Sequence, residues 1–148
     1  MEIIYKIKTA NTKEILAHLQ ECNSNFYPPL VERVNLEDYS RKLVEKSVTF
    51  EAWSENVLVG LVAAYFDRNT DRSVFITNVS VLKKFMGVGI ASDLLNQCIK
   101  YSVSKKIMEI KLEVNKESVN AINLYEKFNF VKDGVNEGFV KMKLKLLN

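Results

Sequence analysis

The stretch from Asn78 to Ser92 (NVSVLKKFMGVGIAS) has the residue types and the spacing that bind a phosphate group. Val79 and Val81 alternate with polar residues, as in a strand, and apolar residues at helical spacing follow Gly87 and Gly89. At the N-terminus of a helix, unpaired backbone N–H groups and the helix dipole favour an anion. Glycine lets the backbone approach that anion closely because it has no Cβ. The stretch therefore predicts a site for a phosphate-containing ligand at a strand-to-helix turn.

Composition limits the classes of protein in which this turn occurs. The chain has 148 residues, 47% hydrophobic and 26% charged, which is typical of one soluble globular domain over residues 1–148. Its net charge of +3 is too small for a nucleic-acid-binding surface but suits a polyanionic ligand. Cys22, Cys98 and the single histidine, His18, form neither a disulfide framework nor a zinc cluster. We therefore expect reduced thiols and no metal.

Hydropathy along the chain indicates where the protein resides. The sequence has no apolar run of membrane-spanning length, and its first residues do not read as a signal peptide. We therefore expect a cytoplasmic protein, a monomer or a homodimer, with neither a membrane nor a nucleic acid as partner.

The elements that position the turn begin with a strand and two helices. We expect a strand at Glu2–Lys8, a helix from an N-cap at Thr12 to about Cys22, and a helix at Leu36–Glu45. Between the helices, two consecutive prolines exclude a regular helix or a central strand. Because this loop is nevertheless apolar, it either covers a ligand or folds onto the core.

Three strands with short connections come next. The expected strands are Ser47–Ser54, Val57–Phe66 and Ser73–Val81. The second is almost continuously apolar, which favours a buried position in the sheet. The connections are too short for a crossover, so these strands are expected to form an antiparallel meander.

After the glycine turn the pattern changes to alternating helices and strands. A helix to about Ser104 and a strand at Ile107–Val114 predict a crossover that returns parallel to the preceding strand. A helix capped by Ser118 through Phe128, a short strand at Phe130–Lys132 and a strand at Gly138–Leu146 complete the chain. The order is β-α-α-β-β-β-α-β-α-β-β. The sequence therefore predicts an α/β (α+β) fold with a mixed sheet that changes from antiparallel to parallel beside the glycine turn.

Two stretches together resemble a known family. VSVLKKFMGVGIA and, about thirty residues later, LEVNKESVNAINLYEKFNF are similar to the acetyl-CoA-binding motif and the C-terminal motif of the GNAT acyltransferase superfamily. The resemblance covers most of the chain, and the two helices after the first strand fit it. It implies a mainly antiparallel central sheet flanked by helices. It also implies direct transfer of an acetyl group from acetyl-CoA to an amine, in a ternary complex.

The first motif implies the contacts with acetyl-CoA. The family pattern Gln/Arg-x-x-Gly-x-Gly/Ala matches here with Met86 in its first place or, shifted by two residues, with Lys84 there. In the family, a backbone N–H of the strand before the turn polarises the thioester carbonyl, and the pantetheine arm enters the gap between this strand and its parallel neighbour. The implied cofactor contacts on this side are Val79, Val81, Met86, Gly87, Val88, Gly89, Ala91 and Ser92.

The second motif implies a catalytic tyrosine. In the pattern Asn-x-x-Ala-Ile-x-Leu-Tyr-Glu-Lys-x-Gly-Phe, Tyr125 falls on the tyrosine, Ser118 on the asparagine and Asn129 on the glycine. Asparagine tolerates the left-handed backbone that a helix end requires. Ser118 can still donate a hydrogen bond to the cofactor. A tyrosine of pKa about 10 stays protonated beside a thiol of pKa about 8.5, so Tyr125 is expected to protonate the departing thiolate.

The sequence does not identify a single general base. Many relatives have a glutamate near Asn78, and an asparagine cannot act as a base. The candidates are Glu113 on the neighbouring strand, Glu51, Asp67, or a water molecule held by backbone carbonyls.

The amine acceptor is equally open. The apolar loop from Phe26 to Val34 and the second helix are expected to line its pocket. The acceptor is a small molecule, such as an amino sugar, or the amine of a peptide or protein. The candidate acceptor-binding residues are Phe26, Tyr27, Arg33 and Asn78.

Two other functions compete with acetyl transfer. GVGIAS resembles the dinucleotide-binding pattern G-x-G-x-x-G with Ser92 in the third place, and Glu113 lies near the expected ribose-binding acid. The preceding antiparallel meander argues against that class of domain. A non-catalytic module that binds acetyl-CoA is compatible with Met86 and Asn78, whereas Tyr125 argues against it.

Overall fold

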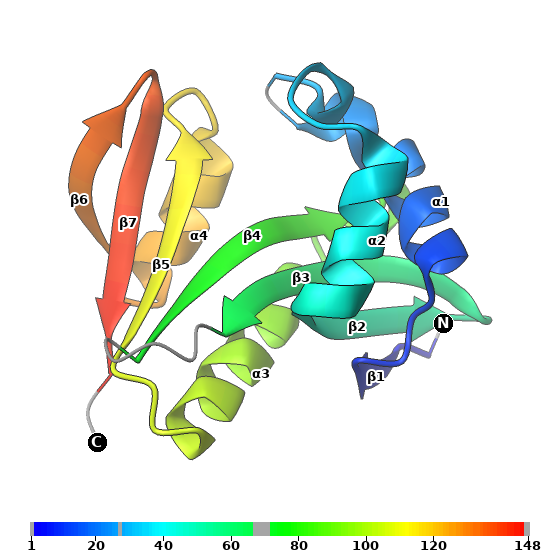
Figure 1. Cartoon of the computed structure of the whole chain (residues 1–148), viewed down its shortest axis with the longest axis horizontal. Coiled ribbons are helices and arrows are strands. Elements are labelled where there is room, and N and C mark those ends of the chain that lie inside the picture. Colours follow the sequence, from blue (N-terminus) through cyan, green and yellow to red (C-terminus); the bar gives the residue numbers. More distant parts are fainter. Residues whose placement is uncertain (1, 27, 67–71, 147–148) are drawn as a thin grey trace.

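The computed structural model describes residues 2–26, 28–66 and 72–146. Its central element is a seven-stranded sheet with the strand order β1-β2-β3-β4-β5-β7-β6 (Figure 1). The strands are β1 Ile4–Ile7, β2 Val48–Ser54, β3 Val57–Phe66, β4 Ser73–Val81, β5 Glu109–Asn115, β6 Val131–Asn136 and β7 Phe139–Lys145. The α-helices are α1 Thr12–Cys22, α2 Leu36–Lys46, α3 Ile90–Ser104 and α4 Val119–Lys127. Short 3₁₀ helices η1 Asn23–Asn25, η2 Leu30–Glu32 and η3 Lys83–Phe85 lie in the connections.

The helices cover both faces of the sheet. On one face, α1 and α2 pack over β2 and β3, where Leu19 and Leu43 meet Leu61 in an apolar cluster. On the other face, α3 covers the first half of the sheet and α4 lies beside β5 (Figure 1). Within the described residues, no helix has the length and apolar character to cross a membrane.

This mixed, mostly antiparallel architecture is the predicted fold class. The only parallel pair in the sheet of the described residues is β4 with β5, which the helix after the glycine turn connects. The change from antiparallel to parallel pairing therefore falls beside that turn, as predicted.

Two boundary predictions are wrong. Asn11, not Thr12, caps α1, because its side chain accepts from the Glu14 N–H at 2.8 Å while the Glu14 carboxylate accepts from the Asn11 N–H at 3.0 Å. The reciprocal pair satisfies two N–H groups that a cap at Thr12 would leave open. β6 extends to Asn136 instead of ending at Lys132, because a bulge within it keeps the strand paired with β7.

The helix-end predictions for α4 have mixed outcomes. Asn129 has φ of 73°, the left-handed conformation expected after the helix. Ser118 stands at the N-cap position, but its side chain makes no capping hydrogen bond.

Candidate functional site

β4 and β5 are paired over only part of their length. Parallel pairing runs from Ser73 with Glu109 to Ile76 with Leu112. Both strands then continue, to Val81 and Asn115, and diverge into a V (Figure 1). The edge of β4 beyond Ile76 therefore presents backbone groups to a gap instead of to a neighbouring strand.

A β-bulge marks the point where the strands part. Ala63 pairs with Asn78 and Ala64 with Ile76, so Thr77 is an extra residue in β4. The Tyr39 hydroxyl, on α2, donates to the Thr77 carbonyl oxygen at 3.0 Å and lies 2.8 Å from Thr77 Oγ1. Bulges bend the strand that contains them. Tyr39 thus holds the bend that opens the gap.

Two hollows occupy this gap and share five residues, Asn25, Phe26, Val79, Ala121 and Tyr125. The larger, of about 270 Å³, is mainly apolar and extends along β4 and α4 toward the glycine turn. The smaller, of about 160 Å³, extends toward β5 and β7. Together they form a passage with Tyr125 in its wall, which suits a long ligand that meets a second molecule at that residue.

The structure brings most of the predicted site residues to this passage. The larger hollow is lined by the predicted cofactor residues Val79, Val81, Met86, Ala91 and Tyr125. The smaller is lined by Phe26, Arg33, Asn78, Glu113 and Ser118. The remaining cofactor predictions, Gly87, Val88, Gly89 and Ser92, belong to the turn and the first turn of α3 and line neither hollow. Tyr27 and Asp67 lie outside the described residues.

The glycine turn fits a phosphate group. Gly87 and Gly89 have φ of 81° and 90°, a region that other residues rarely adopt. A Cβ on either would project into open space, so the backbone can be approached there. Gly89 is the N-cap of α3, and no side chain of the described residues caps it. The N–H groups at this helix end are therefore available to an anion.

Tyr125 is buried where the two hollows meet. Its ring packs 5.9 Å from that of Phe130, between centroids. Burial raises the pKa of its hydroxyl above the ordinary value of 10, so the group is protonated at neutral pH. Tyr125 can therefore donate a proton but cannot serve as the base.

Glu51, one of the base candidates, is fully engaged elsewhere. Its buried carboxylate accepts hydrogen bonds from the N–H groups of Thr9 and Ala10, the Thr49 hydroxyl at 2.6 Å and the Trp53 indole at 3.0 Å. It lines neither hollow of the gap. Glu51 ties the segment before α1 to β2, which is a structural role. Of the described carboxylates proposed as the base, Glu113 is the one that lines the smaller hollow.

Sequence reasoning gave no role to three polar residues that lie at the gap or are hydrogen-bonded to a residue that lines it. They are Tyr39 at the bulge, Ser80 on β4, and His18, which is hydrogen-bonded to Ser80. His18 follows Ile15 by three residues, which is the apolar face of α1 and indicates burial. Nothing in the local sequence of Tyr39 or Ser80 identifies its partner.

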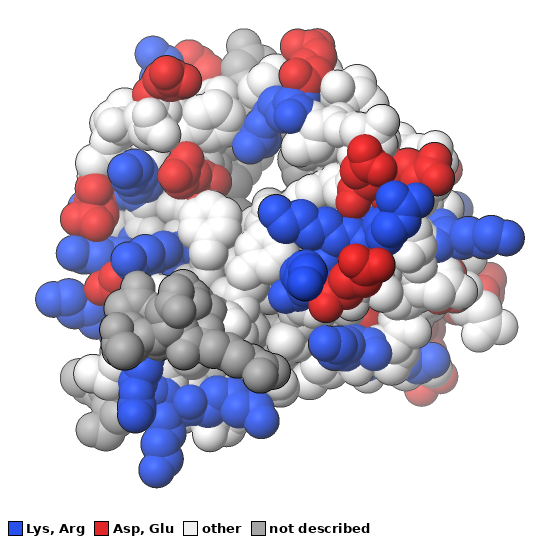
Figure 2. Space-filling model, viewed as in Figure 1, with Lys and Arg blue, Asp and Glu red and all other residues white. Residues whose placement is uncertain are grey.

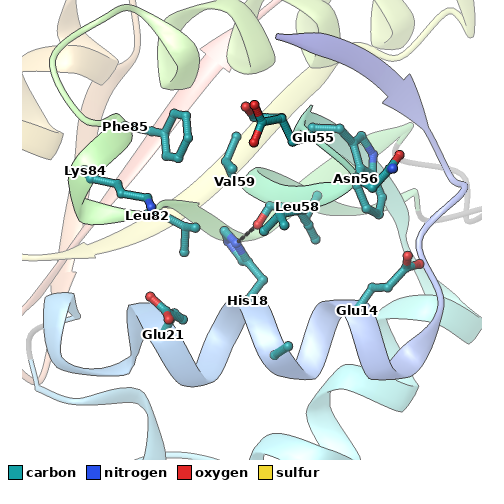
Figure 3. Close-up of a pocket in the computed structure, with 14 residues that line it drawn as sticks. Glu14, His18, Glu21, Glu55, Asn56, Leu58, Val59, Leu82, Lys84 and Phe85 are labelled. Atoms are coloured by element: carbon teal, nitrogen blue, oxygen red, sulfur yellow. Dashed lines mark hydrogen bonds between the residues drawn. The ribbon is translucent and has the colours of Figure 1, made fainter. Parts of the chain in front are cut away.

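A larger cavity, of about 480 Å³, lies between α1, the β2–β3 turn and η3 (Figure 3). Glu14, Glu21 and Glu55 line it, together with Lys84 and Phe85. It includes neither Tyr125 nor the diverging end of β4, so it lacks both the candidate acid and the strand edge of the predicted site.

Figure 2 shows a different hollow, between the two halves of the molecule, with acidic and basic side chains intermingled around it.

The mixed sheet, with its gap between β4 and β5, is the architecture that the resemblance to the GNAT superfamily implies. The chain matches the model of the acetyltransferase (GNAT) family over residues 12–130, and it belongs to that family. Acetyl-CoA is accordingly its cofactor. The dinucleotide-binding alternative is wrong, because β2, β3 and β4 pair antiparallel before the glycine turn instead of forming βαβ units.

Solved structures share the fold, whereas no curated protein matches the sequence. The PaiA N-acetyltransferase of Thermoplasma acidophilum in complex with coenzyme A is similar at 16% identity, with a TM-score of 0.80 over 99% of this chain and 100% of that one. A protein of Pyrococcus horikoshii OT3 is similar at 26% identity, with a TM-score of 0.77 and the same coverage. An acetyltransferase of a Bacillus species in complex with CoA is 17% identical, with a TM-score of 0.75 and, again, the same coverage.

Proposed function

We propose that this protein transfers the acetyl group of acetyl-CoA to an amine, by direct attack in a ternary complex within the gap between β4 and β5. The observation that supports this most is the end of strand pairing at Ile76 and Leu112, which leaves a passage with Tyr125 in its wall. Acetyl-CoA supplies a thioester, whose carbonyl carbon the amine attacks and whose thiol leaves.

The larger hollow and the glycine turn are the cofactor side of the proposed site. N–H groups from Gly87 to Ser92 hold the pyrophosphate, and Val79, Val81 and Ala91 contact the pantetheine arm. A backbone N–H of β4 between Val79 and Val81 donates to the carbonyl oxygen, where negative charge develops. Ser118, at the start of α4, donates a further hydrogen bond to acetyl-CoA from the smaller hollow.

Tyr125 is the general acid of the proposed reaction. Its buried, protonated hydroxyl donates to the leaving thiolate. No covalent intermediate with the protein is needed. Cys22 and Cys98 are buried, and burial raises the pKa values of their thiols to about 11 and about 12. Neither thiol is therefore activated as a nucleophile.

The smaller hollow is the acceptor side. Phe26, Arg33 and Asn78 line it, with Tyr27 proposed from its place in the same loop. Glu113, or a water molecule held by backbone carbonyls, removes the proton that the amine must lose before it attacks. The acceptor is a small amine, such as an amino sugar, or the amine of a peptide.

Amine-dependent release of free CoA thiol tests the proposal. The panel contains butylamine, glucosamine, Nα-acetyl-lysine amide, whose side-chain amine is free, and the peptide Ala-Ala-Ala. Acetyl-CoA is the donor. Thermal melting with acetyl-CoA and with NAD is measured in parallel, since a ligand that binds the folded state raises the melting temperature. Thiol release that requires one of the amines supports the proposal. Stabilisation by acetyl-CoA without turnover of any amine indicates a non-catalytic binding module, and no stabilisation contradicts both.

A further inference from the structure

The smaller hollow of the gap has charged side chains of opposite sign in its wall. Among the described residues that line it, Arg33 is the only cation and Glu113 the only anion. Arg33 lies in the loop between α1 and α2, whereas Glu113 lies on β5, so the two charges come from different halves of the molecule (Figure 1). A molecule in this hollow therefore meets a positive and a negative group together.

The backbone that carries Arg33 is fixed on both sides. The Arg33 N–H donates to the carbonyl oxygen of Leu30 at 2.9 Å, and the Leu30 side chain is buried in the apolar cluster beneath α1 and α2. Two residues further on, Asn35 caps α2 by accepting from the Asp38 N–H at 2.9 Å. Because the main chain is already in place, only the Arg33 side chain has to become ordered when a ligand binds.

The guanidinium group of Arg33 spans the open end of the gap. Its central carbon lies 4.9 Å from the centre of the Phe139 ring on β7. Phe139 lines the same hollow and pairs with Asn115, at the end of β5. On the other side, burial raises the pKa of the Tyr39 hydroxyl beside the bulge, and the positive charge of Arg33 opposes that rise. The charge thus lies between β7 and the bulge of β4, at the smaller hollow.

Arg33 has no carboxylate partner in the part of the chain that the structure describes. The ion pairs found there are Arg41 with Glu37 and with Asp38, Lys111 with Glu109, and Lys143 with Asp133. The contact of Arg33 with Phe139 is a contact with a ring, which has no lone pair to accept a conventional hydrogen bond. The guanidinium N–H groups therefore remain for another acceptor. Their planar, forked arrangement matches two oxygens of a carboxylate or a phosphate.

Glu113 is the group that an amine would meet in the same hollow. Lys141 stands opposite it in the β5–β7 pair, yet no ion pair joins these two described side chains. Lys141 lies toward β6 instead, where its Cδ would be 3.9 Å from a Cβ added to Gly134. Glu113 is therefore left to attract the ammonium form of the acceptor, from which it takes a proton in the proposed reaction.

We infer that the acceptor carries an anionic group, a carboxylate or a phosphate, on the same molecule as its amine, and that Arg33 selects the acceptor by pairing with that group. The amine then lies toward Glu113 and Tyr125, which line the same hollow. The inference rests on the proposed function, because it assigns the acceptor to the smaller hollow. It narrows the acceptor from amines in general to amino acids and to amines that carry a phosphate.

The first test measures binding and needs no turnover. Ligand-detected NMR compares β-alanine with β-alaninamide, and O-phosphoethanolamine with ethanolamine, on protein saturated with CoA. We expect the anionic member of at least one pair to bind about tenfold more tightly, and Arg33→Gln to remove this preference, because charge-assisted hydrogen bonds are lost. The pair with the larger preference identifies the anion as a carboxylate or a phosphate. Equal binding within both pairs, or binding of neither anionic amine, would overturn the inference.

The second test is kinetic and uses the ratio of kcat/KM for the anionic member to that for the neutral member of the better pair. Arg33→Gln should lower this ratio about tenfold, and Arg33→Lys about threefold, because lysine keeps the charge but not the fork. Arg33→Glu should lower it further by repulsion. The two amines of a pair differ in basicity, but every variant is measured with the same pair, so this difference cancels.

Arg41→Gln is the matched control. Arg41 is an exposed arginine on α2 that pairs with Glu37 and Asp38 and does not line the hollow, so its loss should leave the ratio unchanged. Raising the salt concentration from about 0.05 M to about 0.5 M should lower the ratio of the wild type and not that of Arg33→Gln, because salt screens the charge. A salt-independent ratio in the wild type would overturn the inference without any variant.

The remaining outcomes separate selection from support of the fold. Arg33 is exposed, and thermal melting verifies that its variants are folded. If Arg33→Gln lowers kcat/KM equally for both members of a pair, Arg33 merely supports the loop and the inference is overturned. Turnover that does not depend on the anionic group overturns the inference and leaves the proposed function standing. If no amine is turned over, the proposed function fails, while the NMR comparison still decides whether Arg33 binds an anion.

Discussion

The two ends of the β4–β5 pair are built differently. At the closed end, Ser73–Ile76 pairs with Glu109–Leu112, and side chains such as Val74 and Ile110 are fully buried. At the open end, a bulge at Thr77 bends β4 away, and two hollows replace the ladder. Unpaired backbone groups are costly when no water or ligand reaches them. One pair of strands therefore both joins the two halves of the sheet and forms the site that a ligand completes.

The largest effect is expected at the closed end. Ile110→Ala should lower the free energy of unfolding by about 2–5 kcal/mol, because it leaves a cavity between β4, β5 and β7. Urea denaturation measures this loss, and the kcat of the folded fraction should stay near that of the wild type. Val88→Ala, at an exposed residue of the glycine turn, is the control and should leave stability unchanged. If Ile110→Ala unfolds no more easily than this control, the closed end is not what joins the two halves of the sheet.

At the open end, the largest effect is expected on catalysis instead of stability. Tyr125→Phe should lower kcat at least tenfold, which corresponds to about 1.4 kcal/mol or more in activation free energy. General acid catalysis typically increases a rate by more than this factor. The melting temperature should change little, because the ring remains. Steady-state kinetics at saturating acetyl-CoA measures the effect, with Tyr101→Phe as the control, since Tyr101 packs against Phe50 and Phe66 instead of lining the gap. If folded Tyr125→Phe has the kcat of the wild type, Tyr125 is a core residue and not the general acid.

Alanine substitutions at two glycines with similar backbone conformations distinguish the effect of backbone strain from the effect on acetyl-CoA binding. Gly87 has φ of 81° and Gly138, in the β6–β7 turn, has φ of 85°, and a Cβ added to either would have no atom within 4 Å. Alanine at either position should therefore cost a similar strain of about 1–2 kcal/mol. Only Gly87→Ala should also weaken acetyl-CoA binding, about tenfold by calorimetry, because its Cβ occupies the approach of the phosphate. Equal affinities in the two variants would place the phosphate elsewhere.

The smallest effect concerns the bulge that separates the two ends. Tyr39→Phe removes the donor to the Thr77 carbonyl and should cost about 0.5–1.5 kcal/mol, seen as a two- to tenfold fall in kcat/KM for the amine. Tyr101→Phe is the control, because Tyr101 packs against Phe50 and Phe66, away from the bulge. Kinetics on both variants at the same pH measures the difference. Similar values would show that the bulge persists without Tyr39.

Much of the fold follows from local patterns. Strand alternation, the short connections after Ser54 and Phe66, and the crossover after the glycine turn predict the antiparallel meander and its change to a parallel pair. The N-cap prediction failed because two short-range signals compete there. Thr12 and Asn11 are both good N-caps, and the reciprocal contact with Glu14 decides between them.

Local sequence patterns account for the order of the elements, the glycine turn and the place of Tyr125 on its helix, because each depends on residues close together in the chain. The roles of Glu51 and His18, in contrast, follow only from the packing of segments that are far apart in the chain. Their types suit a base, yet each is held by distant partners, Thr9 and Ala10 for Glu51 and Leu58 and Ser80 for His18, which lie about 40 to 60 residues away. Burial and hydrogen bonds determine the chemistry of such groups, and both arise only when distant segments pack.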